Sequence, residues 1–267
     1  MPEGHIVHRL AARYLESFQQ KVSVDSPQGR FAQSAAKLDG RAMTDTEAHG
    51  KHLFLGFDDD WIRIHLGIYG KVRFGPAPPP APVGAIRLRL HDDSAFADLR
   101  GPAACELITP AEKRVLQERL GPDPLRPDAD SNRVWDRVRR SRTTVAALLM
   151  DQNTIAGVGN VYRAEVLFRN RIDPYLAGRD LAREEWETIW ADLVELMGYG
   201  ARVGRIDTVR PEHTPEAMNR PPRVDDHGGE VYVYRRAGHA CHVCETEVRI
   251  ADLGGRNLFW CPACQKR

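Results

Sequence analysis

The chain has 267 residues, of which 42% are hydrophobic and 28% charged, and its formal net charge is +1, as is typical of a globular protein with a buried core. The sequence holds no apolar run of about 18 residues, so it predicts no transmembrane helix. Its first residues lack the charged and then apolar form of a signal peptide. We therefore expect a cytoplasmic protein.

The first part of the chain predicts one helix followed by antiparallel strands. Within residues 3–18, apolar residues recur at steps of three and four and give one helix face. They are Val7, Leu10, Tyr14 and Phe18. Beyond this segment apolar and polar residues alternate, as in half-buried strands. The alternating segments are 52–57, 61–66, 71–74, 85–90 and 94–99. The proline-rich stretch 76–82 predicts a loop, so the expected fold here is a β-sandwich behind a helix.

The second part of the chain is predicted to be helical. Residues 121–127 are rich in glycine and proline and predict a linker. The apolar spacing then predicts four helices, over 132–140, 143–151, 161–169 and 183–197. Residues 210–229 hold four prolines and predict a long exposed loop. The fold class is therefore α+β.

Positive charge is concentrated in part of this helical region. Residues 131–179 contain nine arginines and four acidic residues, an excess of five positive charges. Such a patch can bind phosphates, although a solvated helical surface has the same composition.

Four of the five cysteines form two C-x-x-C pairs near the end of the chain. The pairs are Cys241 with Cys244 and Cys261 with Cys264, and sixteen residues separate them. This spacing is typical of a four-cysteine zinc site, and a closed thiolate shell makes such a zinc ion structural. We expect one Zn²⁺ per chain, with His239 and His242 as alternative ligands. Arg256 follows Gly254 and Gly255 between the pairs, where its guanidinium suits a phosphate.

The first residues suggest a nucleophile. If Met1 is removed, Pro2 carries a secondary α-amine that titrates at about pH 8, so a useful fraction is neutral. A neutral amine can attack a sugar C1′ and form a Schiff base, and the adjacent Glu3 can move protons.

Five segments together resemble the formamidopyrimidine-DNA glycosylase/endonuclease VIII family, in the same order and over nearly the whole chain. The segments are 1–4, 50–53, 65–70, 157–165 and 255–264. The resemblance implies a catalytic β-sandwich domain over 1–121, a helix–two-turn–helix DNA-binding domain over 122–232 and a zinc finger over 233–267. It also implies damaged DNA as the partner, bound between these parts, a monomer, and a cytoplasmic, nucleoid-associated protein of the bacterial type.

The same resemblance implies roles for individual residues. Pro2 would be the nucleophile, Glu3 the general acid and base, and Lys51 a contact to the phosphate beside the lesion. Five further positions are expected to bind DNA, at a wedge that replaces the flipped base and at two other sites. The wedge is Ile68 with Tyr69, and the other sites are Asn160 with Arg163 in the glycine-turn motif and Arg256. An alternative for Ile68 is that it continues the buried alternation of the preceding strand.

The resemblance implies a bifunctional DNA glycosylase and AP lyase that acts by a Schiff base on Pro2 and β,δ-elimination. The opening Pro2-Glu3-Gly4 is similar to the endonuclease VIII branch, which favours oxidised pyrimidines, although His5 stands where that branch has proline. Alternatives are a glycosylase for oxidised purines, a non-catalytic zinc protein that binds damaged DNA, and a zinc-organised interaction protein.

Overall fold

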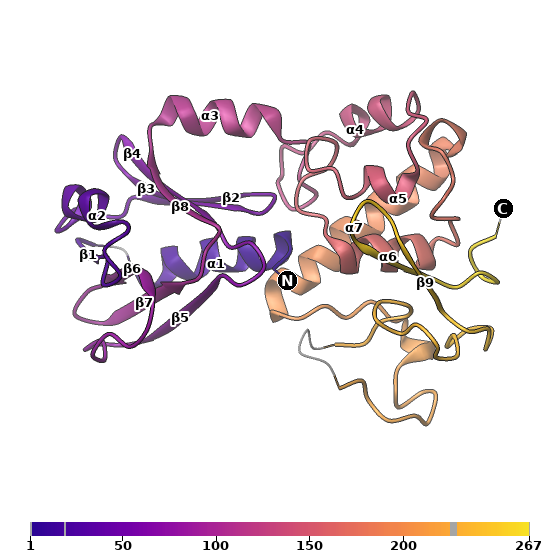
Figure 1. Ribbon diagram of the computed structural model, residues 1–267. Coiled ribbons are helices and arrows are strands. Elements are labelled where there is room, and N and C mark those ends of the chain that lie inside the picture. The colour runs from indigo at the N-terminus through magenta and orange to yellow at the C-terminus, as the bar shows by residue number, and fades with distance from the viewer. Residues whose placement is uncertain (1, 19, 225–228, 267) are drawn as a thin grey trace. The chain divides into compact units, whose positions relative to one another are not determined.

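The computed structural model describes residues 2–18, 20–224 and 229–266. It divides into two compact units, Met1–Arg119 and Leu120–Arg267 (Figure 1). The predicted boundary at residue 121 lies next to this division, whereas a third domain that begins at residue 233 stays a prediction. No helix in the described part of the chain is both long and apolar enough to cross a membrane.

Unit 1 contains two four-stranded antiparallel sheets. In sheet order, the first consists of β1 (Ser23–Asp25), β6 (Ile86–His91), β7 (Ala95–Arg100) and β5 (Lys71–Pro76). The second consists of β2 (Asp45–His49), β3 (His52–Phe57), β4 (Asp60–His65) and β8 (Ala104–Ile108). Alternating apolar residues from both sheets fill one core. The expected antiparallel sandwich is confirmed, including the β3–β4 hairpin with its acidic turn.

Helix α1 (Gly4–Ser17) contacts both sheets. Its buried face contains Val7 and Tyr14, as the apolar spacing predicts. The Thr46 hydroxyl of β2 donates to the Ala11 carbonyl over 2.8 Å. The Tyr14 ring lies edge-on to Phe74 of β5, with centroids 4.9 Å apart. These contacts fix the second half of α1 against the sandwich.

Two helices of unit 1, α2 (Ala32–Leu38) and α3 (Pro110–Arg119), were not predicted. The sequence does carry a signal for α3. Thr109 and Glu112 form a reciprocal capping box, in which the Thr109 N–H donates to Glu112 Oε2 over 2.8 Å and the Glu112 N–H donates to Thr109 Oγ1 over 3.2 Å. α3 was missed because none of its residues is buried, so it lacks an apolar face.

Unit 2 is mainly helical and ends in a β-hairpin. Its helices are α4 (Ser131–Val138), α5 (Val145–Leu148), α6 (Asn160–Arg169) and α7 (Arg183–Val203). Two 3₁₀ helices are η1 (Gly178–Asp180) and η2 (Pro211–His213), and the hairpin pairs β9 (Arg249–Asp252) with β10 (Asn257–Trp260). Helices and hairpin share one apolar core. α5 is shorter than expected because the chain turns repeatedly after it, and α7 runs on to a left-handed Gly204 with φ 82°.

The segment 121–127 is not the exposed linker that its composition suggested. Residues 121–124 are buried in unit 2. The Gly121 N–H donates to the Gln152 carbonyl over 2.9 Å, and the Pro122 carbonyl accepts from Ala156 N–H over 3.0 Å. A Cβ at Gly121 would lie 2.3 Å from the Thr154 carbonyl oxygen, so glycine is required here for close packing. In the predicted loop 210–229, residues 225–228 lie outside the described residues.

Candidate active site and nucleic-acid interface

Pro2 and Glu3 stand at the head of α1. Pro2 is half-buried, and Glu3, the residue that precedes the first helical turn, is 0% exposed. The Ile6 N–H donates to the Glu3 carbonyl over 3.0 Å, which starts the helix directly after Glu3. A carboxylate at this position is favoured by the positive end of the helix dipole. Met1, whose removal the predicted chemistry needs, lies outside the described residues.

Lys51 occupies the two-residue turn between β2 and β3. Gly50, the other turn residue, has φ 59°, a conformation that glycine adopts without strain. In Figure 1 this turn and the N-terminal end of α1 lie on the same side of unit 1. Helix α1 packs on β2 and β3, so the two predicted catalytic segments belong to one end of the sandwich.

Two histidines beside Lys51 form part of this end of the sheet. His52 and His65 are opposite each other on β3 and β4, with ring centroids 4.9 Å apart. Arg63 Nε donates to His52 Nδ1 over 3.3 Å. Burial, followed by the charge of Arg63, lowers the pKa of His52 to about 3. Burial, Arg63 and Lys51 lower the pKa of His65. Both imidazoles are therefore neutral at physiological pH and make this end of the sheet less positively charged than its residue types suggest.

Neither histidine is among the site residues predicted from the sequence. One feature of the sequence indicates that the two histidines are neighbours. In a tight β3–β4 hairpin, His52 and His65 occupy paired positions at the open end. That pairing becomes evident only when the hairpin register is known.

The predicted wedge residues lie on an exposed turn. Ile68 is 63% and Tyr69 79% exposed, and β4 has already ended at His65. The Gly70 N–H donates to the Leu66 carbonyl over 2.9 Å, and a Cβ at Gly70 would lie 2.3 Å from that carbonyl oxygen. The alternative that Ile68 continues the buried alternation is wrong, because the turn directs it away from the core.

Asn160 and the hairpin tip come together in unit 2, although 97 positions separate Asn160 from its partner. Asn160, the first residue of α6, donates from Nδ2 to the Asn257 carbonyl over 2.9 Å. Arg256, at the exposed tip of the β9–β10 hairpin, immediately precedes Asn257. Because an amide nitrogen has two protons, one remains for another acceptor. The two residues predicted to bind phosphates thus lie close together, beside the N-terminus of a helix.

Arg163 lies inside the unit. Its side chain is among the largest fully buried ones, with 1% exposure. One guanidinium nitrogen donates to Asn160 Oδ1 and, over 3.0 Å, to the Asn257 carbonyl. A guanidinium so buried has little surface to offer to DNA, so the expected direct contact has no geometric support. The observed contacts instead align Asn160 with the hairpin.

The buried carboxylate of Glu165, which the sequence analysis left without a role, makes a second link between α6 and the C-terminal region. It accepts from Thr208 Oγ1 over 2.6 Å and from Tyr232 N–H over 2.7 Å. It also accepts from the Val233 and Tyr234 N–H groups, each over 2.9 Å. Four donors on one buried carboxylate satisfy a charge that would otherwise be costly in the core.

The four cysteines of the two C-x-x-C pairs form one cluster. The sulfur atoms of Cys241, Cys244, Cys261 and Cys264 all lie within 4.8 Å of one another, and neither histidine considered as an alternative belongs to the group. The Cys241–Cys264 sulfurs are 3.9 Å apart and the Cys244–Cys261 sulfurs 3.4 Å. A tetrahedral thiolate site with Zn–S bonds of about 2.3 Å has sulfur separations of about 3.8 Å. The donor set and its geometry therefore fit a zinc ion.

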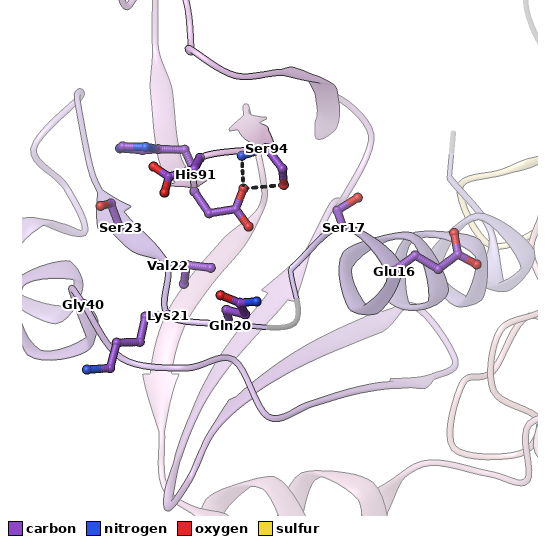
Figure 2. Close-up of a pocket in the computed structure, with 11 residues that line it drawn as sticks. Glu16, Ser17, Gln20, Lys21, Val22, Ser23, Gly40, His91 and Ser94 are labelled. Atoms are coloured by element: carbon purple, nitrogen blue, oxygen red, sulfur yellow. Dashed lines mark hydrogen bonds between the residues drawn. The ribbon is translucent and has the colours of Figure 1, made fainter.

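A cavity of about 520 Å³ lies elsewhere in unit 1. Figure 2 shows that Glu16 and Ser17 line it from the C-terminal end of α1, with His91 and Ser94 opposite. Fourteen helical residues separate this end of α1 from Glu3, about 20 Å at 1.5 Å per residue. The three carboxylates of Glu16, Asp92 and Asp93 outnumber Lys21 in its lining, so this cavity does not favour a phosphate. We assign this cavity no part in the site.

Comparisons with known proteins agree with the fold of both units. The formamidopyrimidine-DNA glycosylase N-terminal domain matches residues 1–105, and the formamidopyrimidine-DNA glycosylase H2TH domain matches residues 120–210. Structures of Lactococcus lactis Fpg in complex with DNA that contains an abasic site are similar in fold. One of them has a TM-score of 0.80 at 22% identity and covers 99% of this chain and 100% of its own.

Relatives at higher sequence identity come from both branches of the family. Endonuclease 8 1 of Mycobacterium tuberculosis is 48% identical over 274 residues, which cover 99% of this chain and 100% of the relative. Formamidopyrimidine-DNA glycosylase of Methylococcus capsulatus is 31% identical over 241 residues, which cover 86% and 84%. The greater identity to the endonuclease 8 relative agrees with the predicted nearness to that branch. The chain therefore belongs to the formamidopyrimidine-DNA glycosylase/endonuclease VIII family, whose members are DNA glycosylases and AP lyases.

Proposed function

We propose that this protein removes oxidised bases from DNA and then cuts the strand, with Pro2 as nucleophile. The observation that carries the proposal is the position of Glu3, a buried carboxylate directly after Pro2 at the head of α1. Burial keeps water from competing for the proton that Glu3 moves. Lys51, at the same end of the sandwich, supplies a positive charge for the phosphate beside the lesion.

The first chemical step joins the protein to the sugar. After removal of Met1, the neutral amine of Pro2 attacks C1′, the bond from C1′ to the base breaks, and the base leaves with a proton from an acid. Glu3 is the group placed to give and take protons at this point. The C1′–O4′ bond of the sugar then breaks and O4′ takes a proton, which gives an iminium ion between Pro2 and the opened sugar.

The iminium ion makes the C2′ proton acidic. Loss of that proton breaks the bond from C3′ to its phosphate, and a second elimination breaks the bond from C5′ to the other phosphate. The products are a one-nucleoside gap with a phosphate at each end. Pro2 and Glu3 are sufficient for these steps, and Lys51 balances the charge of the adjacent phosphate.

DNA is held by contacts to its backbone. We assign these contacts to Asn160, through its second amide proton and the helix N-terminus, and to Arg256 on the hairpin tip. Arg163 keeps the two aligned from inside the unit. The four cysteines would hold a structural zinc ion, which cross-links the two knuckles at the base of the hairpin.

The target base has to leave the stack before Pro2 can reach its sugar. Ile68 and Tyr69, on the exposed turn after β4, are the side chains available to fill the space it leaves. The family relatives with DNA-bound structures include complexes with an oxidised pyrimidine. We infer oxidised pyrimidines as the preferred substrates here from the Pro2-Glu3-Gly4 opening and the 48% identity to an endonuclease 8 relative. Such a protein would act in the bacterial cytoplasm, on the nucleoid.

Borohydride trapping tests the proposed chemistry. Sodium borohydride reduces the iminium ion, so the wild-type protein should become covalently attached to DNA that contains an abasic site. Pro2→Gly, and a form with extra residues before Pro2, should give no adduct, whereas Arg30→Gln, which lies on the surface of unit 1, should trap normally. An adduct that persists when the N-terminus is blocked would move the nucleophile to a lysine such as Lys51. Tight binding of damaged DNA without any adduct would identify a non-catalytic DNA-binding protein.

A further inference from the structure

A small cavity of about 170 Å³ lies within unit 2, where the C-terminal end of α6, helix η2 and the cysteine knuckles meet. Phe168 and Tyr232 form an aromatic floor, with stacked rings whose centroids are 4.6 Å apart. Val243 and Cys264 of the knuckles line another side. Asn160 lies at the opposite end of α6, about 15 Å away along a helix of ten residues. The cavity is therefore distinct from the proposed phosphate contacts of Asn160 and Arg256.

Two exposed arginines in the lining have guanidinium groups that can bind a ligand. Within the part of the chain that the structure describes, the guanidinium groups of Arg171 and Arg210 make no hydrogen bond or ion pair. Arg169 differs, because Asp192 accepts two of its N–H groups, each over 2.9 Å. Glu212 is the one carboxylate that lines the cavity, and it faces the two guanidinium groups of Arg171 and Arg210.

The hydrogen bonds of Tyr232 hold His213 in place. The Tyr232 hydroxyl oxygen accepts the Arg210 N–H over 2.8 Å and lies 2.9 Å from His213 Nδ1, a contact in which either atom can donate. His213 also lines the cavity, beside the two guanidinium groups.

We propose that this cavity binds a phosphate group. Two guanidinium groups provide more N–H donors than the two oxygens of a carboxylate can use, whereas a phosphate has three or four oxygens to accept them. The Phe168 and Tyr232 rings and the Val243 side chain accommodate the organic part that carries the phosphate. That phosphate belongs either to a DNA backbone or to a small molecule such as a nucleotide.

Inorganic phosphate is the probe for the first test. Its binding to the zinc-loaded protein is measured by ³¹P NMR line broadening and by calorimetry, at constant ionic strength with chloride as the reference anion. The cavity variant is Arg171→Gln combined with Arg210→Gln. The control, Arg114→Gln with Arg119→Gln, removes the same charge from the exposed helix α3. We expect phosphate binding to weaken roughly tenfold or more in the cavity variant and to be unchanged in the control.

A second measurement identifies the source of the phosphate. If a DNA backbone occupies the cavity, saturating duplex DNA will displace inorganic phosphate, and the cavity variant will lose more DNA affinity than the control. If a small molecule occupies it, phosphate will bind equally well to the DNA complex, and both variants will bind DNA alike. The proposal is overturned if the wild-type protein does not bind phosphate, or if the cavity variant binds it as well as the control does. Zinc content and circular dichroism verify that the variants are folded.

Discussion

The wedge assignment can be tested by removing both exposed side chains of the turn after β4. In the double variant Ile68→Ala, Tyr69→Ala, the loss of folding stability should be small. Complete burial of such a side chain contributes about 3 kcal/mol. Ile68 is 63% and Tyr69 79% exposed, so together they contribute about 2 kcal/mol or less. The melting temperature should fall by no more than about 8 °C.

The effect on base excision should be larger. If the two side chains fill the space of the flipped base, their loss should slow excision of a paired lesion about tenfold or more, because unstacking a base costs a few kcal/mol. Strand cleavage at a pre-formed abasic site should be nearly unchanged, since no base has to be flipped out. Single-turnover rates on the two DNA substrates measure both effects.

Leu66→Ala provides the matched comparison. Leu66 lies at the start of the same turn but is 3% exposed, so its truncation should cost about 2–5 kcal/mol of stability. If the double variant loses stability to the same degree as Leu66→Ala and both activities fall together, Ile68 and Tyr69 stabilise the fold and are not a wedge.

Four further changes test other parts of the molecule. Arg256→Gln should weaken binding of all DNA sequences alike and reduce the slope of log Kd against log salt by about one, measured by fluorescence anisotropy; a loss limited to one lesion would contradict a phosphate contact. Cys261→Ser should lose both metal and DNA affinity while unit 1 stays folded, and full DNA affinity without metal would argue against the structural zinc. Tyr14→Phe should leave the melting temperature unchanged or raise it, because the buried Tyr14 hydroxyl has no hydrogen-bond partner among the described residues; a loss above about 1 kcal/mol would reveal a partner. Finally, stability should fall as the pH drops below about 6.5, where unfolded histidines gain a proton. In the folded protein, burial lowers the pKa of His5 and that of His52 to about 3, so both imidazoles stay neutral at pH 5. A melting temperature that is constant from pH 7 to pH 5 would therefore contradict their burial.

Local patterns in the sequence were sufficient for the parts of this protein that depend on residues close together in the chain. The C-x-x-C spacing predicted the cysteine cluster because each knuckle is a single turn, and only one further pairing was needed to bring the two turns together. Alternation of apolar residues predicted the β3–β4 hairpin, and the three-and-four spacing predicted α1 and α7. The family motifs predicted Pro2, Glu3 and Lys51 as site residues because each lies in a short segment with a characteristic order of residues.

Tertiary structure alone decided which of the candidate side chains face outward. Arginines look alike in a sequence, yet Arg163 is buried and joins Asn160 to Asn257, whereas Arg171 stays exposed. The glycine- and proline-rich segment 121–124 resembled a linker because its composition favours turns, but its burial depends on backbone hydrogen bonds to residues some thirty positions away. Contacts between distant segments decide which side chains are exposed and which groups they bond to. The local pattern that predicts a helix, a strand or a knuckle does not contain the free energy of those contacts.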